Sequence, residues 1–548
     1  MDFGSLEQLA LELIRTPSVS QTPGEVALAQ KIYGLLAQNE YFQQHPEYLC
    51  LTPLPQDRLG RANVLALVRG EAETTAKTVI LHGHLDTVGV EDYGELAPYA
   101  DDPTALKEHF QGQTLPAAVK AELLSPEWLC GRGSLDMKSG LAVHLGFFLE
   151  WARTAAERHG NLVFLATVDE ESENSGIIAA LPHLIAWREQ FRLAYVAALN
   201  NDYTAPLYAG DPNYYVYTGT VGKLLPAFYI RGRETHVGQP FEGFDPALLA
   251  AEIVRALDLN PELADESDGE VALPPTVLKL TDLKQAYTVQ TPGDAFLYCN
   301  YLVHGEAVEE TLAKLKRVAT EACRRTLAAV AERAQAYATR TGLPPTEPPG
   351  PVKVWTYAEL YAAVERRTGP ALRERLAAAA RHGLAAGRDH RLVALDLVRE
   401  VARRLPEREP QVVLFFAPPY CPPNRLTGRT AAETSAAAAL EAALAAVRSE
   451  TGAPIERRTF FPGISDSSYL TLTVSDTSLA ALQANFPGWG ELFTLPVDTI
   501  RCLCIPALNL GAYGKDGHKF TERVYKPYTF GILPRVVART VEELLRRC

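Results

Sequence analysis

The chain has 548 residues, of which 47% are hydrophobic and 22% are charged, a balance typical of a folded globular protein with more than one domain. The formal net charge of −13, without any basic run, argues against nucleic acid as a partner, because phosphate binding needs clustered Lys and Arg. The sequence shows no secretory signal, no apolar stretch long enough to cross a membrane and no disulfide framework, so we expect a cytoplasmic protein without a membrane partner.

The first 213 residues alternate between helices and buried strands. Apolar residues recur at helical spacing in some segments, and short β-branched runs bounded by turn residues predict strands between them. The expected helices are residues 6–15, 26–38 and 141–160, and the expected strands are residues 63–70, 77–88 and 161–168. This alternation predicts an α/β fold with a mostly parallel sheet and helices on both faces. Functional groups in such sheets tend to lie at the carboxyl ends of the strands.

The order of elements changes after residue 213. A strand, a helix, two strands, a long helix and a further strand follow, at residues 219–233, 245–259, 276–303, 306–340 and 410–420. This is the split βαβ order, and it predicts an inserted α+β, ferredoxin-like lid domain over residues 214–418. A Pro-rich segment opens a helical insertion at about 341–410. Residues 1–213 and 419–548 are then expected to form the two parts of the catalytic domain.

The segment HGHLDTV places His84 and Asp86 two residues apart at a strand end, so both can face the same cavity. A metal-bound imidazole usually donates its other N–H group to a carboxylate or a carbonyl, and Asp86 is placed to orient His84 in this way. A single His-x-Asp pair is more often an ordinary surface or core pair. We expect His82, on the same strand face, to be a packing residue rather than a ligand.

Two further segments carry isolated or clustered carboxylates. Asp136 is the only carboxylate in CGRGSLDMKSG, which on its own reads as a glycine-rich turn before a helix. Asp169, Glu170 and Glu171 stand side by side after an apolar strand. A carboxylate beside another is hard to ionise unless a cation compensates, so one could bind a metal while the other accepts a proton from water. The alternative for these three residues is a solvated acidic loop.

Two later residues could complete a metal site. Asp202 follows another apolar strand, with Asn200 and Asn201 as competing candidates. His518 lies in a glycine-flanked loop, and Glu522 is either its hydrogen-bonding partner or an ordinary acid at a helix start. Two Zn²⁺ ions would carry a charge of +4, which three carboxylates and a bridging hydroxide would neutralise, as a partly buried site requires.

As an ordered set, these motifs resemble the di-zinc aminoacylase, dipeptidase and glutamate-carboxypeptidase family (peptidase clan MH). The resemblance implies that His84 and Glu171 bind one zinc, Asp202 and His518 the other, and Asp136 bridges the two. It also implies that Glu170 is the general base, that Asp86 orients His84, and that the Asp136–Met137 peptide bond is cis. Co²⁺ or Mn²⁺ could replace zinc in a site so rich in carboxylates.

The resemblance extends to three further segments. In THVGQPFEGFDPA it implies that His236 stabilises the oxyanion of the substrate, the alternative being an ordinary turn histidine. In FPGISDSSY it implies that Gly463, Ser465 and Asp466 lie near the substrate. Many family members carry an arginine on a lid strand to hold the substrate carboxylate, but the strand FLYCNYLV offers Asn300 instead. Recognition of a carboxylate in the usual way is therefore in doubt.

The function expected from these residues is metal-dependent hydrolysis of an amide or peptide bond in a small substrate. The helical lid insertion and segments such as VVLFFAPPY look like the arginine-utilisation branch of the family, so the substrate is expected to be an N-acyl amino acid, a dipeptide or an arginine-related amide. The alternatives are an aminopeptidase on short peptides and a catalytically silent member that binds a metabolite or a protein partner. A homodimer is compatible with the sequence but not required by it.

Overall fold

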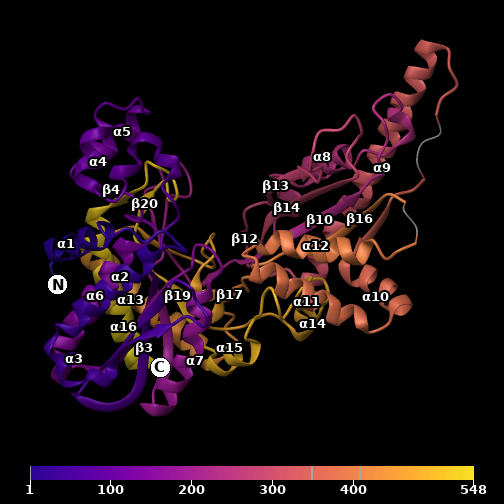
Figure 1. The fold of residues 1–548 in the computed structure, drawn as a ribbon. Coiled ribbons are helices and arrows are strands. Elements are labelled where there is room, and N and C mark those ends of the chain that lie inside the picture. The colour runs from indigo at the N-terminus through magenta and orange to yellow at the C-terminus, as the bar shows by residue number, and fades with distance from the viewer. Residues whose placement is uncertain (1, 347–349, 407–408) are drawn as a thin grey trace. The chain divides into compact units, whose positions relative to one another are not determined.

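The computed structural model describes residues 2–346, 350–406 and 409–548, and the chain divides into two compact units (Figure 1). Unit 1 consists of Met1–Thr220, Asn424–Leu472 and Pro496–Cys548, and unit 2 of Val221–Pro423 and Thr473–Leu495. No helix among the described residues is both long and apolar enough to cross a membrane.

The assignment of Thr473–Leu495 to unit 2 differs from the sequence interpretation, which placed all of residues 419–548 in the catalytic domain. Leu492 of this segment packs into the apolar core of unit 2. Asn485 accepts hydrogen bonds from the backbone N–H of Phe416 (2.8 Å) and, through its side chain, from that of Ala358 (3.0 Å). These contacts join residues far apart in the sequence, which is why the sequence pattern gave no sign of them.

The main sheet of unit 1 has the strand order β1-β2-β5-β3-β6-β19-β7-β18. Neighbours run parallel in the pairs β5–β3, β3–β6, β6–β19 and β7–β18, which confirms the mostly parallel sheet. The strands are β1 (Leu49–Pro53), β2 (Ala62–Arg69), β3 (Glu73–His84), β5 (His159–Thr167), β6 (Ala194–Asn200), β7 (Tyr214–Tyr217), β18 (Ile455–Arg458) and β19 (Ala507–Asn509). Smaller sheets of unit 1 join β4 (Trp128–Cys130), β20 (Gly514–Lys515) and β21 (Arg523–Tyr525), and β8 (Gly219–Thr220) with β17 (Asn424–Arg425).

Helices cover both faces of this sheet. Every residue from Ala62 to Val68 is buried, which an amphipathic strand with one solvated face would not allow. α6 contacts β2, β3 and β5, and α7 contacts β1, β2 and β5. The helices of unit 1 are α1 (Phe3–Ile14), α2 (Pro23–Ala37), α3 (Glu40–Gln44), α4 (Pro103–Phe110), α5 (Ala117–Leu124), α6 (Lys138–Arg153), α7 (Ser175–Gln190), α13 (Ala431–Thr451), α15 (Val497–Leu503) and α16 (Leu533–Arg547).

The sheet of unit 2 has the strand order β13-β14-β10-β16-β15, and all neighbours are antiparallel except β15 and β16. With the chain order β10, α8, β13, β14, α9, β16, this is the expected ferredoxin-like arrangement. Its strands are β9 (Gly222–Leu224), β10 (Pro226–Arg231), β13 (Thr276–Asp282), β14 (Asp294–Val303), β15 (Lys353–Thr356) and β16 (Gln411–Phe416), and β11 (Glu266–Ser267) pairs with β12 (Glu270–Val271).

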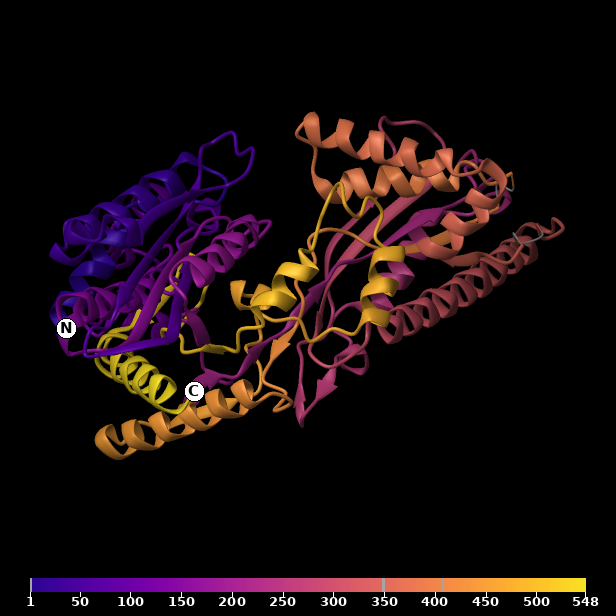
Figure 2. The same ribbon diagram turned by 90° about the horizontal axis from the view of Figure 1, so that it is seen from below.

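The helices of unit 2 lie on both faces of its sheet (Figure 2). They are α8 (Pro246–Leu257), α9 (Val308–Thr341), α10 (Tyr357–Thr368), α11 (Ala371–Ala385), α12 (His390–Ala402) and α14 (Asp476–Ala484). The insertion expected at about 341–410 contains α10, α11 and α12, and also the strand β15, which the sequence analysis did not predict. Residues 347–349 and 407–408 of the insertion lie outside the described residues.

Candidate metal centre

The candidate residues that follow three strands of unit 1 meet at one edge of the sheet. β3 runs parallel to β5 on one side and to β6 on the other, with His84 opposite Thr167 and His82 opposite Asn200. The carboxyl ends of the three strands therefore coincide, and these ends carry His84 and Asp86, then Asp169 to Glu171, then Asp202. Asp136 comes from the loop between β4 and α6, and His518 from the loop between β20 and β21.

Asp136 lies between two histidines. His84 Nε2 is 3.1 Å from Asp136 Oδ1, and His518 Nε2 is 3.0 Å from Asp136 Oδ2. His518 Nε2 is also 2.9 Å from Glu171 Oε1. One candidate ligand atom each from His84, Asp136 and Glu171 lies within 4.8 Å of the others. Each oxygen of Asp136 thus faces a different imidazole, as a bridging ligand requires.

The charges of this cluster fit divalent metal ions. Burial raises the pKa of Asp136, but hydrogen bonds from His518 and His84 outweigh it and hold the pKa well below its usual value. Burial raises the pKa of Asp202 well above its usual value; the charge of Asp136 raises it further, whereas His84 opposes the shift. Buried carboxylates so close together need compensating positive charge, and imidazole with carboxylate is a donor set suited to Zn²⁺ and related ions.

Asp86 acts through a different atom from the one expected. His84 Nδ1 lies 2.9 Å from the backbone carbonyl oxygen of Asp86, whereas the carboxylate Oδ1 is 3.7 Å away. The carboxylate instead accepts the backbone N–H groups of Glu170 and Glu171, each at 3.1 Å. The backbone of Asp86 therefore orients His84, and its side chain fixes the two glutamates.

Glu522 fits neither of the two roles left open by the sequence. Its Oε1 accepts the N–H groups of Leu135 (2.9 Å) and Asp136 (3.2 Å), and its Oε2 is 2.7 Å from Arg132 Nη1. Arg132 Nη2 also contacts Asp92 Oδ1 at 2.6 Å. Glu522 therefore holds the backbone that carries Asp136. In the sequence, the only indication that a buried acid lies beside this segment was Arg132 of the Gly-Arg-Gly motif, which needs a negatively charged partner when it is buried.

The backbone of the Asp136 segment has the special geometry expected of it. The Asp136–Met137 peptide bond is cis, which confirms the prediction from the resemblance. Further along, a Cβ atom at Gly140 would lie 2.2 Å from the carbonyl oxygen of Asn201. Only glycine therefore allows the start of α6 to approach the residue that precedes Asp202.

The side-chain amide nitrogens of the two asparagines before Asp202 have partners of their own. Asn200 Nδ2 donates to Ser465 Oγ at 2.7 Å, and Asn201 Nδ2 donates to the carbonyl of Gly140 at 3.0 Å. Asp202 uses Oδ1 to accept the N–H group of Tyr203 at 2.8 Å. The Oδ1 atoms of Asn200 and Asn201 have no hydrogen-bond partner among the described residues, so these contacts do not decide between the three candidates, and Asp202 as the ligand stays a prediction.

The segment that contains Gly463, Ser465 and Asp466 lies against the ends of β5 and β6. Asp466 accepts a hydrogen bond from Thr167 Oγ1, the last residue of β5. Gly463 accepts through its carbonyl from Thr220 Oγ1 at 2.8 Å. His82 contacts Ser467 Oγ of the same segment at 3.2 Å, and burial lowers its pKa to about 3, so it is neutral and packs inside unit 1 as expected.

His236 and Asn300 belong to unit 2, and their roles toward the substrate stay predictions. His236 is exposed, and its Nδ1 accepts the N–H group of Gly238 at 3.0 Å. Asn300 lies in β14 opposite Thr276 of β13.

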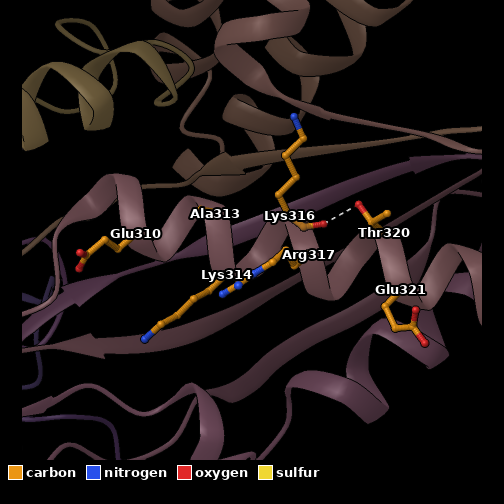
Figure 3. Close-up of a pocket in the computed structure, with 7 residues that line it drawn as sticks. All are labelled: Glu310, Ala313, Lys314, Lys316, Arg317, Thr320 and Glu321. Atoms are coloured by element: carbon orange, nitrogen blue, oxygen red, sulfur yellow. Dashed lines mark hydrogen bonds between the residues drawn. The ribbon is translucent and has the colours of Figure 1, made fainter.

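Unit 2 also has an open hollow of about 1000 Å³ along α9 (Figure 3). Its lining residues are Glu310, Ala313, Lys314, Lys316, Arg317, Thr320 and Glu321. They come from one stretch of a single helix and include no histidine or cysteine, so this hollow lacks the convergent donors found at the strand ends of unit 1.

Comparison with known proteins agrees with this geometry. Residues 80–483 match the family described as Peptidase family M20/M25/M40. The chain is 38% identical over 544 residues to Protein RocB of Bacillus subtilis, covering 99% of this chain and 95% of that protein. It is 30% identical over 310 residues to a succinyl-diaminopimelate desuccinylase of Pseudomonas fluorescens, covering 56% of this chain and 69% of that enzyme.

Solved structures agree on the fold. A tripeptidase from Staphylococcus aureus superposes with a TM-score of 0.53 at 14% identity, covering 100% of this chain and 99% of that chain. Aminopeptidase PepT from Bacillus cereus superposes with a TM-score of 0.52 at 13% identity, covering 99% of both chains. The chain therefore belongs to peptidase family M20/M25/M40 and is a metal-dependent hydrolase of amide bonds.

Proposed function

We propose that the protein hydrolyses the amide bond of an N-acyl amino acid, a dipeptide or an arginine-related amide, with Glu170 as the general base beside two metal ions. One observation carries this proposal. Glu170 is 3% exposed, and its Oε1 atom has no hydrogen-bond partner among the described residues. A buried carboxylate oxygen left without a partner is costly in a stable fold, and a reacting water molecule would supply the missing partner.

The contacts favour a different pairing of ligands from the one implied by the resemblance. His518 contacts Glu171 and one oxygen of Asp136, whereas His84 contacts the other oxygen. His84 is also among the charged groups that act on Asp202. We therefore assign Glu171 and His518 to one metal and His84 and Asp202 to the other, with Asp136 shared. Zn²⁺ fits these donors, and Co²⁺ or Mn²⁺ could replace it.

Two divalent ions in such a site would lower the pKa of water and polarise a substrate carbonyl. Glu170 accepts the proton of the attacking water and returns it to the leaving amine. Asp86 keeps the backbone of Glu170 in place through its side chain. His236 of unit 2 is the candidate donor to the oxyanion, and Asn300, Gly463, Ser465 and Asp466 are candidates for contact with the rest of the substrate.

Two similarities support the proposed substrate class. A relative at 30% identity is named for removing a succinyl group from an amino acid, which is the cleavage of an N-acyl amide. The segments that resemble the arginine-utilisation branch, together with 38% identity to Protein RocB, support an arginine-related substrate within that class. A hydrolysis screen of N-acyl amino acids, arginine-containing dipeptides and tripeptides would identify it.

Glu170→Gln tests the proposal. Removal of the proton acceptor should lower kcat by about 10²- to 10⁴-fold, while the metal content measured by mass spectrometry stays the same. Glu189→Gln, at an exposed position near the end of α7, is the matched control and should leave both quantities unchanged. Full turnover by Glu170→Gln with its metals bound would show that another group is the base.

A further inference from the structure

A buried ion network lies behind the Asp169–Glu171 segment. Arg61 Nη1 is 2.8 Å from Asp169 Oδ1 and 3.1 Å from Glu25 Oε2. Arg61 Nη2 and Nε lie 3.0 and 3.1 Å from Asp57 Oδ1. The side chains of Arg61, Asp169 and Glu25 are 9%, 2% and 0% exposed. One guanidinium therefore joins three carboxylates that come from different parts of unit 1.

The same groups also hold the backbone beside Glu170. Glu25 Oε1 accepts the N–H group of Asp169 at 2.8 Å. Asp169 has a φ of 65°, a left-handed conformation that is unfavourable for a residue with a Cβ atom. Its carbonyl accepts the N–H group of Asn174 at 2.8 Å, and its side chain accepts that of Ser175 at 3.3 Å. The direction of the next residue, Glu170, depends on this conformation.

Buried carboxylates thus receive the backbone N–H groups of three successive residues. The carboxylate of Glu25 accepts the N–H group of Asp169. The carboxylate of Asp86 accepts the N–H groups of Glu170 and Glu171. The two carboxylates differ in their surroundings. Asp86 adjoins the ligand His84, whereas Glu25 lies in the first turn of α2 and is paired with Arg61. None of Glu25, Asp57 and Arg61 is a candidate metal ligand, so this network can be altered without changing the donor set.

We propose that Arg61, with Glu25 and Asp57, forms a positioning network that fixes the carboxylate of Glu170 by holding Asp169 in its left-handed conformation. This inference rests on the proposed function, because it takes Glu170 as the general base. Buried ion pairs contribute little to stability relative to apolar packing, whereas they specify geometry through several directed hydrogen bonds. Catalytic rates are sensitive to displacements of about 1 Å in such groups.

Arg61→Lys is the principal test, because it keeps the positive charge but cannot reach Asp57, Glu25 and Asp169 with a planar fork. The variant should fold and retain its metals, with kcat reduced about 10- to 100-fold and KM changed less than about threefold. Hydrogen exchange of the peptide spanning residues 164–176 should be faster, because Glu25, which accepts the N–H group of Asp169, is no longer held by the guanidinium. The full-length protein loaded with Zn²⁺ is used throughout.

A second test variant and a control are measured in the same way as Arg61→Lys. Glu25→Gln leaves one side-chain oxygen for two donors, the N–H group of Asp169 and the guanidinium of Arg61, and should reproduce the fall in kcat and the faster exchange. Arg539→Met, which breaks an exposed pair with Glu450, is the control and should change neither. The proposal is overturned if Arg61→Lys and Glu25→Gln both keep the kcat and the exchange rate of the natural protein. It is also overturned if kcat falls only in proportion to lost metal.

A failure of the proposed function would have a different signature. In that case the natural protein with its metals bound would hydrolyse none of the amides in the screen, or Glu170→Gln would keep full activity. The exchange measurement does not depend on turnover, so it would still decide whether Arg61 and Glu25 hold the Asp169–Glu171 backbone.

Discussion

Parallel strands in unit 1 and antiparallel strands in unit 2 distribute polar side chains in different ways. β3, β5 and β6 end together, so the residues that follow them converge on His84 and Asp136. In unit 2 the neighbours β13, β14, β10 and β16 alternate in direction, so consecutive strand ends fall on opposite edges. The core beneath them is apolar and includes Phe296, Val413 and Phe415. The direction of the strands therefore determines where a cluster of ligands can form.

Removal of metal is expected to have the largest effect, and it should lower the stability of unit 1 more than that of unit 2. Dialysis against a chelator should abolish hydrolysis and lower the unfolding temperature of unit 1, because its buried carboxylates lose their compensating charge. A metal held at about 1,000 times its Kd contributes about 4 kcal/mol to stability. Differential scanning calorimetry with and without Zn²⁺ measures the shift. An equal shift of both units would contradict the assignment of the metal centre to unit 1.

A core substitution in unit 2 should lower the stability of unit 2 without removing metal from unit 1. Phe415 is fully buried in β16 and stacks on Phe296, so Phe415→Ala should destabilise unit 2 by about 3–5 kcal/mol. Its metal content should stay that of the natural protein, because the donors all lie in unit 1. Denaturant unfolding and metal analysis of the same sample check both statements. Loss of metal would show that the metal centre depends on the core of unit 2.

Glu522→Gln is expected to have a smaller effect, which is a loss of metal affinity. The amide nitrogen of glutamine would face Arg132, so the side chain could no longer accept from Leu135 and Asp136 while pairing with the guanidinium. Metal affinity should fall about 10- to 100-fold, as it does when a group that orients a ligand is removed. Competition with a fluorescent chelator measures this. Glu108→Gln, exposed on α4, is the control and should leave the affinity unchanged.

The sequence predicted those features that depend on local pattern. The strands that precede the candidate ligands, the split βαβ order and the cis bond at Asp136–Met137 follow from spacing or from the family motif, and all three are present, although the bounds of single strands differ. Contacts between distant segments could not be predicted in this way. Glu522 and Asp136 are 386 residues apart, and Arg61 and Asp169 are 108 apart. Such pairs form only when the whole of unit 1 is folded.

The role of Asp86 shows a second limit of sequence reasoning. The spacing of His84 and Asp86 correctly predicted that the two residues interact, but it could not distinguish a backbone oxygen from a carboxylate oxygen. Both atoms belong to the same residue and lie close to the same ring. The side chain was therefore free to bind a different segment, which the sequence pattern gave no means to identify.

The chain passes between the two units at four junctions, after Thr220, Pro423, Leu472 and Leu495. Unit 2 is therefore encoded by two separate stretches of the gene. A fragment limited to the longer stretch, Val221–Pro423, would lack Leu492, which belongs to the apolar core of unit 2. Unit 2 therefore cannot be cut from the chain as one continuous segment with its core complete.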